Sequence, residues 1–78
     1  MKINYDKEVD ALYIELSDKP YHHSTRLDSH RCIDYSPDGE MIGIEIIRAS
    51  KHFSLEGIPG KRDVFRQVKD DCPGLVSV

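Results

Sequence analysis

The chain has no tryptophan, only two cysteines and no long apolar run. Two cysteines allow one disulfide at most, which excludes a disulfide framework and leads us to expect a cytoplasmic protein with free thiols. No apolar stretch approaches the length needed to cross a membrane, and no N-terminal run resembles a signal peptide. Glycine-rich phosphate loops and the C-x-x-C and H-E-x-x-H spacings are also lacking, so no motif indicates a nucleotide or zinc site.

Basic residues are too few to favour a nucleic-acid partner. The 78 residues include 14 acidic and 11 basic side chains, a formal net charge of −3 at pH 7. Binding to phosphate backbones needs a basic face, whereas these charges are interspersed as on an ordinary solvated surface. The length leaves room for a single domain, which we take to span residues 1–78.

Alternating apolar and polar residues predict two β-hairpins. The first joins residues 1–6 to residues 11–17 through a polar bend, and the second joins residues 31–35 to residues 41–47. Residues 23–27 predict a short polar edge strand. The fold class that follows is α+β, with a small antiparallel sheet of two β-hairpins (four to five strands) followed by one C-terminal helix.

The sheet is assigned to residues 1–50, and residues 51–78 are expected to form a connection, a helix and a tail. The helix is predicted at about residues 63–72, with Asp63 as its N-cap and a Pro-Gly pair as its stop. One helix face is indicated by apolar residues that recur every four positions: Val64, Val68 and Cys72.

The turn of the second hairpin is the most specific local signal. A type I turn with a bulged glycine is predicted by four residues in series: Ser36, Pro37, Asp38 and Gly39. This turn sets a register in which Tyr35 lies opposite Met41 and Asp34 opposite Ile42. A shift of one residue would place Ile33 on the same face as the isoleucines of the second strand. The turn would then no longer have its preferred residues at each position, so we take the register that the turn dictates.

In this register both faces of the hairpin are substantially apolar. Asp34 shares one face with Ile42, and Glu45 shares the other with Tyr35. A sheet that is apolar on both faces needs two covers. We expect the C-terminal helix to supply one and a second copy of the sheet to supply the other, which gives a homodimer with an isologous interface.

Asp34 and Glu45 interrupt these apolar faces, so turn chemistry does not explain them. A buried carboxylate is more often paired with an arginine or with backbone amides than catalytic, and Arg31 and Arg48 lie close in sequence. Acid–base catalysis would also need a raised pKa and a cleft, which no motif indicates. The four histidines lack the spacing of zinc ligands. We therefore assign no catalytic residue, no metal and no cofactor.

Two blocks of the sequence, YDKEVDALYIELSD and CIDYSPDGEMIGIEIIRAS, resemble the short bacterial and archaeal proteins grouped as domain of unknown function family 2283. The resemblance covers roughly residues 1–50 and implies a small α+β or mostly-β domain without an assigned activity. The chain departs from the family pattern at Ser36, where an acidic residue is usual, and after Ser50. Three motif residues that strand propensity does not demand form the candidate polar site: Tyr13, Asp34 and Glu45.

Some members of the family are encoded beside small toxin-like proteins, which implies an antitoxin-like or accessory role. We therefore expect a non-enzymatic protein-interaction module that forms a homodimer, binds a protein partner encoded nearby and has no membrane association. The alternative is a small-molecule or metal-binding protein, or a weak hydrolase, that uses Asp34, Glu45 and Tyr13.

Overall fold

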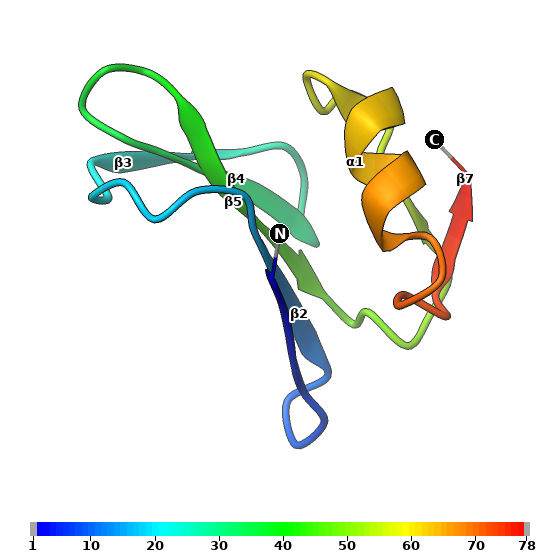
Figure 1. Cartoon of the computed structure of the whole chain (residues 1–78). Helices are drawn as coiled ribbons and strands as arrows, with labels where there is room; N and C mark the ends of the chain where they lie inside the picture. Colours follow the sequence, from blue (N-terminus) through cyan, green and yellow to red (C-terminus); the bar gives the residue numbers. More distant parts are fainter. Residues whose placement is uncertain (1, 78) are drawn as a thin grey trace.

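The computed structural model describes residues 2–77 and contains a five-stranded antiparallel sheet with the strand order β1-β2-β5-β4-β3 (Figure 1). The first hairpin (β1 and β2) joins the second hairpin (β4 and β5) through the pairing of β2 with β5, and β3 forms the far edge. The strands are β1 (Lys2–Asp6), β2 (Ala11–Glu15), β3 (His23–Arg26), β4 (Arg31–Tyr35) and β5 (Met41–Ile47). The predicted hairpins and the polar edge strand are confirmed.

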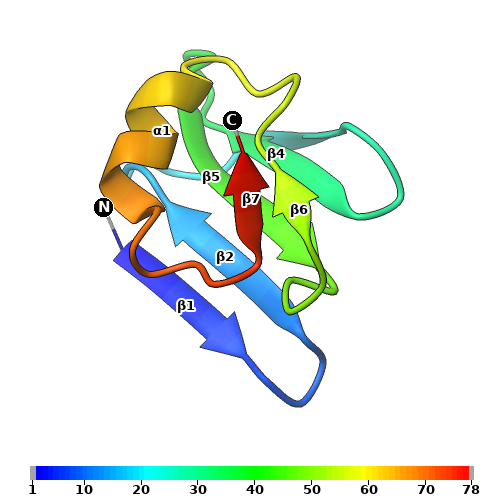
Figure 2. The same cartoon turned by 90° about the vertical axis from the view of Figure 1, so that its right-hand side faces the viewer.

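A second layer packs on one face of this sheet. It consists of β6 (Phe53–Ser54), α1 (Lys61–Val68) and β7 (Leu75–Ser77), with β6 and β7 paired in parallel. Figure 2 shows these elements in front of the sheet. We call this layer the cover, the sheet face beneath it the inner face and the opposite one the outer face. The predicted α+β class, a small sheet followed by one C-terminal helix, is confirmed, and the parallel pair adds to it.

The turn between β4 and β5 has the predicted chemistry. The amide of Gly39 donates to the carbonyl of Ser36 (3.0 Å), and the amide of Ser36 donates to the carbonyl of Glu40 (2.9 Å). Gly39 has a φ of 84°, a conformation that glycine adopts without a steric penalty. Tyr35 lies opposite Met41, as predicted.

Behind the turn, the predicted register is wrong. A β-bulge interrupts the pairing, so Asp34 lies opposite Gly43 rather than opposite Ile42. Ile33 therefore lies opposite Ile44, and both are buried on the inner face. A bulge adds one residue to one strand, which lets the turn keep its preferred residues while the isoleucines stay on one face.

This correction removes the reason given for a face-to-face homodimer. Asp34 does not lie among isoleucines. It lies on the outer face, where its cross-strand partner Gly43 has no side chain, and the residues around it are polar or half-exposed. The buried apolar side chains of the central strands lie on the inner face, and the chain's own cover packs against them. The homodimer remains a prediction, without support from a second apolar face.

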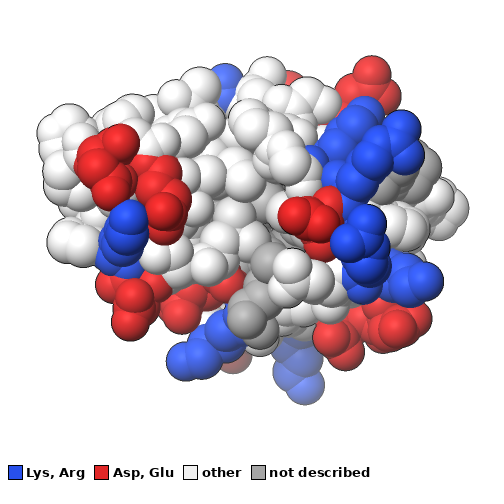
Figure 3. All heavy atoms as spheres, turned by 45° about the horizontal axis from the view of Figure 1, so that its top comes forward, with Lys and Arg blue, Asp and Glu red and all other residues white. Residues whose placement is uncertain are grey.

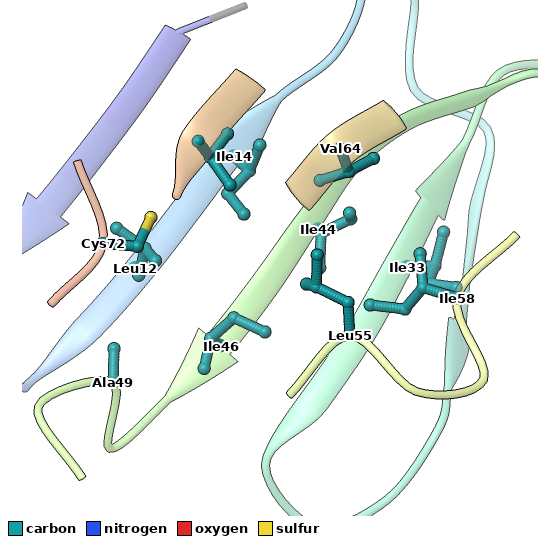
Figure 4. Packing of buried hydrophobic residues seen from close by; sticks show 11 residues of the cluster. Leu12, Ile14, Ile33, Ile44, Ile46, Ala49, Leu55, Ile58, Val64 and Cys72 are labelled. Carbon is teal, nitrogen blue, oxygen red and sulfur yellow. The ribbon is translucent and has the colours of Figure 1, made fainter. Parts of the chain in front are cut away.

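The core lies between the inner face and the cover (Figure 4). The three central strands of the sheet, β2, β5 and β4, contribute buried side chains at alternate positions, and the cover contributes side chains from its loops and helix. The sheet contributes Leu12, Ile14, Ile33, Ile44 and Ile46, and residues beyond β5 contribute Ala49, Leu55, Ile58, Val64, Val68 and Cys72. The core therefore depends on residues 51–77 as much as on the sheet.

Helix α1 begins earlier than predicted. Its first residue is Lys61, and Gly60 precedes it in a left-handed conformation with a φ of 70°. The carbonyl of Gly60 accepts hydrogen bonds from the amides of Asp63 (3.1 Å) and Val64 (3.2 Å). Asp63 is thus in the first turn and is not the N-cap.

The helix also ends earlier than predicted, at Val68. Asp70 and Asp71 follow, and carboxylates at a helix C-terminus are destabilising because the helix dipole is negative there. Cys72 lies outside the helix but remains buried in the core, as its spacing indicated. The tail then forms β7 beside β6, a strand that its short apolar sequence did not predict.

Candidate functional site

The outer face brings the three candidate residues together. The strand registers place Asn4, Tyr13 and Glu45 in one cross-strand row, which continues through Cys32 to the β3 edge. Asp34 belongs to the neighbouring row, opposite Gly43. Tyr13 and Asp34 are half-buried, whereas Glu45 is exposed.

Tyr13 crosses β5 to reach β4. Its hydroxyl donates a hydrogen bond to Oδ2 of Asp34 at 3.0 Å. Gly43 lies between them on β5, and a Cβ atom at that position would collide with the phenol oxygen of Tyr13. Glycine is therefore required here by close approach, because only a residue without a side chain leaves room for the tyrosine ring.

Asp34 is held from its other side as well. The hydroxyl of Ser24 on β3 donates to Oδ1 of Asp34 at 2.6 Å, and the hydroxyl of Tyr21 lies 2.9 Å from that of Ser24. Since Ser24 donates its proton to the carboxylate, Tyr21 is the donor to Ser24. A chain of hydrogen bonds thus crosses the outer face from Tyr21 to Tyr13.

The surroundings of Tyr13 hold its phenol in the protonated form. Burial, followed by the hydrogen bond to Asp34, raises the pKa of Tyr13 to about 12. The negative charges of Glu15 and Glu45 act in the same direction. The phenol is therefore neutral at physiological pH and serves as a hydrogen-bond donor.

The side chain of Glu45 makes no hydrogen bond or ion pair with any residue between 2 and 77. Of the partners considered for Asp34 and Glu45, neither Arg31 nor Arg48 forms an ion pair with them among residues 2–77. Arg31 instead bonds to Asp28 through Nε and Nη2 (both 2.9 Å), and its Nη1 donates to carbonyls of the cover. Its guanidinium ties β4 to the cover and leaves the outer face acidic.

A shallow hollow of about 370 Å³ adjoins Tyr13 and Glu45. Its remaining walls come from the first hairpin, including the exposed side chain of Val9 and the half-buried Ala11. The hollow thus combines an apolar floor with a carboxylate and an aromatic ring. Nothing in the sequence pattern indicated it, because its shape depends on the bend between β1 and β2.

A second hollow, of about 500 Å³, lies where the second hairpin meets the cover. Its charged lining is mostly basic: Asp28, His30, Arg31, Arg48, Lys51 and His52. All of these except Arg31 are exposed. No run of basic residues revealed the group, since its members are spread over residues 28–52. On the face shown in Figure 3, acidic and basic side chains are interspersed.

Histidines and cysteines do not converge on the outer face. The rings of His22 and His23 contact each other (Nδ1 to Nδ1, 2.9 Å). Both cysteines are free: Cys32 is half-buried, and burial raises the pKa of the Cys72 thiol. Between residues 2 and 77, no group of three or more His, Cys, Asp or Glu side chains is placed to hold a metal ion.

The family comparison agrees with the resemblance in the sequence. The family model described as "Protein of unknown function (DUF2283)" matches residues 2–50, more than half of the chain. The chain belongs to the DUF2283 family. No curated protein and no solved structure gave a significant match. In the part of the chain that the structure describes, no helix has the length and apolar character needed to cross a membrane.

The DUF2283 segment contains the whole five-stranded sheet and ends at Ser50, shortly after β5 ends at Ile47. Asp10 ties its two sequence blocks together, accepting hydrogen bonds from the amide (2.9 Å) and hydroxyl (2.6 Å) of Ser50 and from the hydroxyl of Tyr5 (2.6 Å). These hydrogen bonds lower the pKa of Asp10, and the bond from the Ser50 hydroxyl has the largest effect. The link between the two blocks therefore gives a structural role to Tyr5, Asp10 and Ser50. The motif residues of the outer face take no part in this link.

Proposed function

We propose that this DUF2283 protein is a non-enzymatic interaction module whose outer face binds a basic segment of a partner protein, as an antitoxin-like or accessory protein would. The observation that carries the proposal is the position of Tyr13, which lies on an open sheet face among carboxylates. Asp34 is bonded to its hydroxyl, and Glu15 and Glu45 both act on its pKa. The core is buried by the chain's own cover, so this face is free for a partner.

The charge of the outer face favours a cationic partner. Among residues 2–77, none of the ion pairs includes Glu15, Asp34 or Glu45. The basic residues of this face, Lys2 and Arg26, lie on its two edge strands. Complementary charge increases the rate of encounter and selects among partners.

The hollow beside Tyr13 suits a lysine or arginine side chain. Such side chains bury an apolar stem and keep the charged end near solvent. Val9 and Ala11 would contact the stem, while Glu45 and the ring of Tyr13 would contact the charged group. A cation over an aromatic ring adds a further attraction.

The same geometry argues against catalysis. Both oxygens of Asp34 already accept hydrogen bonds, from Tyr13 and Ser24. A phenol with a pKa of about 12 is a poor base or nucleophile at neutral pH. The site is also a shallow hollow on a sheet face, whereas enzymes bury most of a small substrate.

A titration with defined peptides tests the face and the charge together. ¹⁵N-labelled protein is titrated with an arginine-rich peptide and, in parallel, with a glutamate-rich peptide of equal length. We expect the basic peptide to shift the amide signals of residues 11–15 and 43–45, and Glu45→Gln to weaken binding. The matched control is Glu56→Gln, an exposed carboxylate on the cover. Stronger shifts with the acidic peptide, or shifts confined to the cover, would contradict the proposal.

The partner itself is sought by co-expression with the tagged product of the neighbouring gene. We expect a complex that survives purification with wild-type protein and with Glu56→Gln, and that is lost with Glu45→Lys. Recovery of the complex with Glu45→Lys would show that the outer face is not the binding surface.

A further inference from the structure

Strand β1 is a free edge of the five-stranded sheet. It pairs with β2 on one side, and no element of the described chain lies along its other side, as Figure 2 shows. Four of its five residues are exposed: Lys2, Asn4, Tyr5 and Asp6. The backbone N–H and C=O groups of an edge strand are unpaired and form a template for another strand.

We propose that β1 pairs antiparallel with β1 of a second copy of this chain, which joins two five-stranded sheets into one continuous sheet. The two-fold axis passes midway between the Asn4 residues of the two copies and is perpendicular to the sheet, so the pairing is isologous and closed. Each copy contributes the same five residues.

The sequence of β1, KINYD, is complementary to itself in this register. Asn4 lies opposite the second copy's Asn4, and Lys2 lies opposite the second copy's Asp6 at both ends of the pair. Ile3 lies opposite the second copy's Tyr5. Opposite charges and aromatic–β-branched pairs are both favourable when they are directly opposite in antiparallel strands.

The other free edge lacks this property. Strand β3, HSTR, would pair with itself about a point between Ser24 and Thr25. Arg26 would then lie opposite His23, which offers no negative charge to pair with it. All four residues of β3 are exposed polar side chains, so self-pairing would bury no apolar surface. Complementarity therefore distinguishes β1 from β3.

Apolar surface near the β1 edge adds to the case. Tyr5 is 50% exposed although its hydroxyl is fixed by Asp10. Two hollows on the inner side include β1 residues: one of about 380 Å³ at Ile3 and one of about 300 Å³, mostly apolar, at Tyr5. In the paired sheet, the ring of the second copy's Tyr5 lies across from Ile3 and reduces the exposure of both.

This inference does not rest on the proposed function, because edge pairing reaches only the β1 rim of the outer face, where Asn4 and Asp6 line the hollow, and leaves Tyr13, Asp34 and Glu45 free. It also replaces the face-to-face contact expected from the sequence with an edge-to-edge one. Loss of the peptide binding described above would leave the dimer intact, and a monomeric protein could still bind a basic peptide. The two proposals therefore fail separately.

Sedimentation equilibrium with charge-reversed variants tests the pairing. We expect wild-type protein to dimerise between about 1 µM and 1 mM, a range in which small interfaces associate. Lys2→Glu places Glu opposite Asp6 at both ends, and Asp6→Lys places Lys opposite Lys2. Each single variant is expected to dimerise about tenfold more weakly, since two attractive pairs become repulsive.

Mixing the two single variants provides the decisive measurement. In the mixed dimer both end pairs are again of opposite charge, so we expect a heterodimer of near wild-type affinity. The double variant Lys2→Glu/Asp6→Lys restores both pairs within one chain and should also recover. Because Oδ1 of Asp6 accepts the amide of Glu8 (3.0 Å), circular dichroism must confirm that Asp6→Lys is folded. The side chain of Lys2 makes no hydrogen bond found among residues 2–77, but Lys2→Glu places a glutamate opposite Glu15 on β2, so circular dichroism must confirm the fold of this variant as well.

Arg26→Glu on β3 is the matched control, and it should leave the dimer unchanged. Three outcomes would overturn the proposal: a wild-type monomer at 1 mM, a dimer that is insensitive to both reversals at β1, or a dimer that is weakened or strengthened tenfold by Arg26→Glu. The last result would assign the contact to β3.

Discussion

The two faces of the five-stranded sheet share one backbone and differ in what holds their side chains. On the inner face, Ile14, Ile44 and Ile46 are fully buried against the cover. On the outer face, Tyr13 and Asp34 are half-buried and are fixed by a hydrogen bond of 3.0 Å. Packing holds the first face, and directional polar contacts hold the second.

Strand β5 shows the contrast within a few residues. Ile44 and Ile46 are buried, while Glu45 between them is exposed. A buried side chain that is shortened leaves a void that its neighbours cannot fill, whereas an exposed one can be exchanged at little cost. Buried side chains of the inner face therefore contribute most to the stability of the protein. Exposed side chains of the outer face can be exchanged with little loss of stability, so binding can determine which residues stand there.

The largest effect is expected from Ile44→Ala. Ile44 is fully buried between the sheet and the cover (Figure 4), and its truncation should lower the free energy of unfolding by about 2–5 kcal/mol. Urea unfolding followed by circular dichroism measures the loss. The matched control is Glu45→Ala, the next residue on the opposite face, which should change stability by less than about 0.5 kcal/mol. Equal losses at the two positions would break the distinction between the faces.

Gly43→Ala should have the next largest effect. A methyl group at this position collides with the phenol of Tyr13, so the ring must move and the bond to Asp34 is lost. We expect a loss of about 1–3 kcal/mol in the free energy of unfolding. The collision is absent when Tyr13 is truncated, so Gly43→Ala should cost clearly less in a Tyr13→Ala background. Additive losses in this double-mutant cycle would show that the ring does not depend on Gly43.

The sheet itself was predictable from the sequence because each strand carries its own alternation. Leu12 and Ile14 on β2, and Ile44 and Ile46 on β5, are spaced two apart and lie on the inner face as that period requires. The polar edge strand β3 was predictable for the same local reason. Elements whose pattern is complete within a few residues need no knowledge of the rest of the chain.

The register behind the turn was not predictable, because two local rules conflicted. Turn chemistry fixed Tyr35 opposite Met41, while the isoleucine pattern required Ile33 opposite Ile44. The structure satisfies both by means of a bulge. A choice between the rules was therefore wrong, and it put Asp34 on the wrong face. Neither rule alone shows that one extra residue resolves the conflict.

Contacts between distant segments account for the other differences. Strand β7 exists because Leu75 pairs with Phe53, and no local pattern in the tail indicates that partner. The candidate residues Tyr13 and Asp34 came from the family resemblance, but their hydrogen bond depends on the register of three strands and on the absence of a side chain at Gly43. The resemblance selected these residues as candidates, and only the fold identified their contact.

Ser36→Ala tests the turn that sets this register. Ser36 is 1% exposed, and its hydroxyl oxygen accepts the amide of Glu40 (3.2 Å) and bonds to Asp38. Loss of these contacts should lower the free energy of unfolding by about 1 kcal/mol. Hydrogen exchange at the Glu40 amide should accelerate, while exchange at Ile44 follows global stability alone. An unchanged Glu40 amide would show that its second acceptor, Oδ1 of Asp38 (3.1 Å), holds the turn without the serine.

The smallest effect at neutral pH, and the one most specific to the outer face, is the ionisation of Tyr13. Its pKa of about 12 in the folded protein exceeds the ordinary value of 10.0, so below pH 10 the phenol is protonated in both states and stability is unaffected. Between pH 10 and 12 the unfolded chain loses this proton and the folded chain retains it. Stability should therefore fall as pH rises through that interval.

Absorbance at 295 nm, followed during an alkaline titration of folded protein, measures this ionisation directly. Tyr13→Phe should remove one phenol that titrates near pH 12, and Asp34→Asn should lower the pKa of Tyr13 because the carboxylate that accepts its proton in a hydrogen bond loses its charge. Tyr5 is the internal reference, since its pKa is raised by a different carboxylate, Asp10. If Asp34→Asn shifted Tyr5 and left Tyr13 unchanged, the hydrogen bond across the outer face would not exist in solution, and the two faces would differ in packing alone.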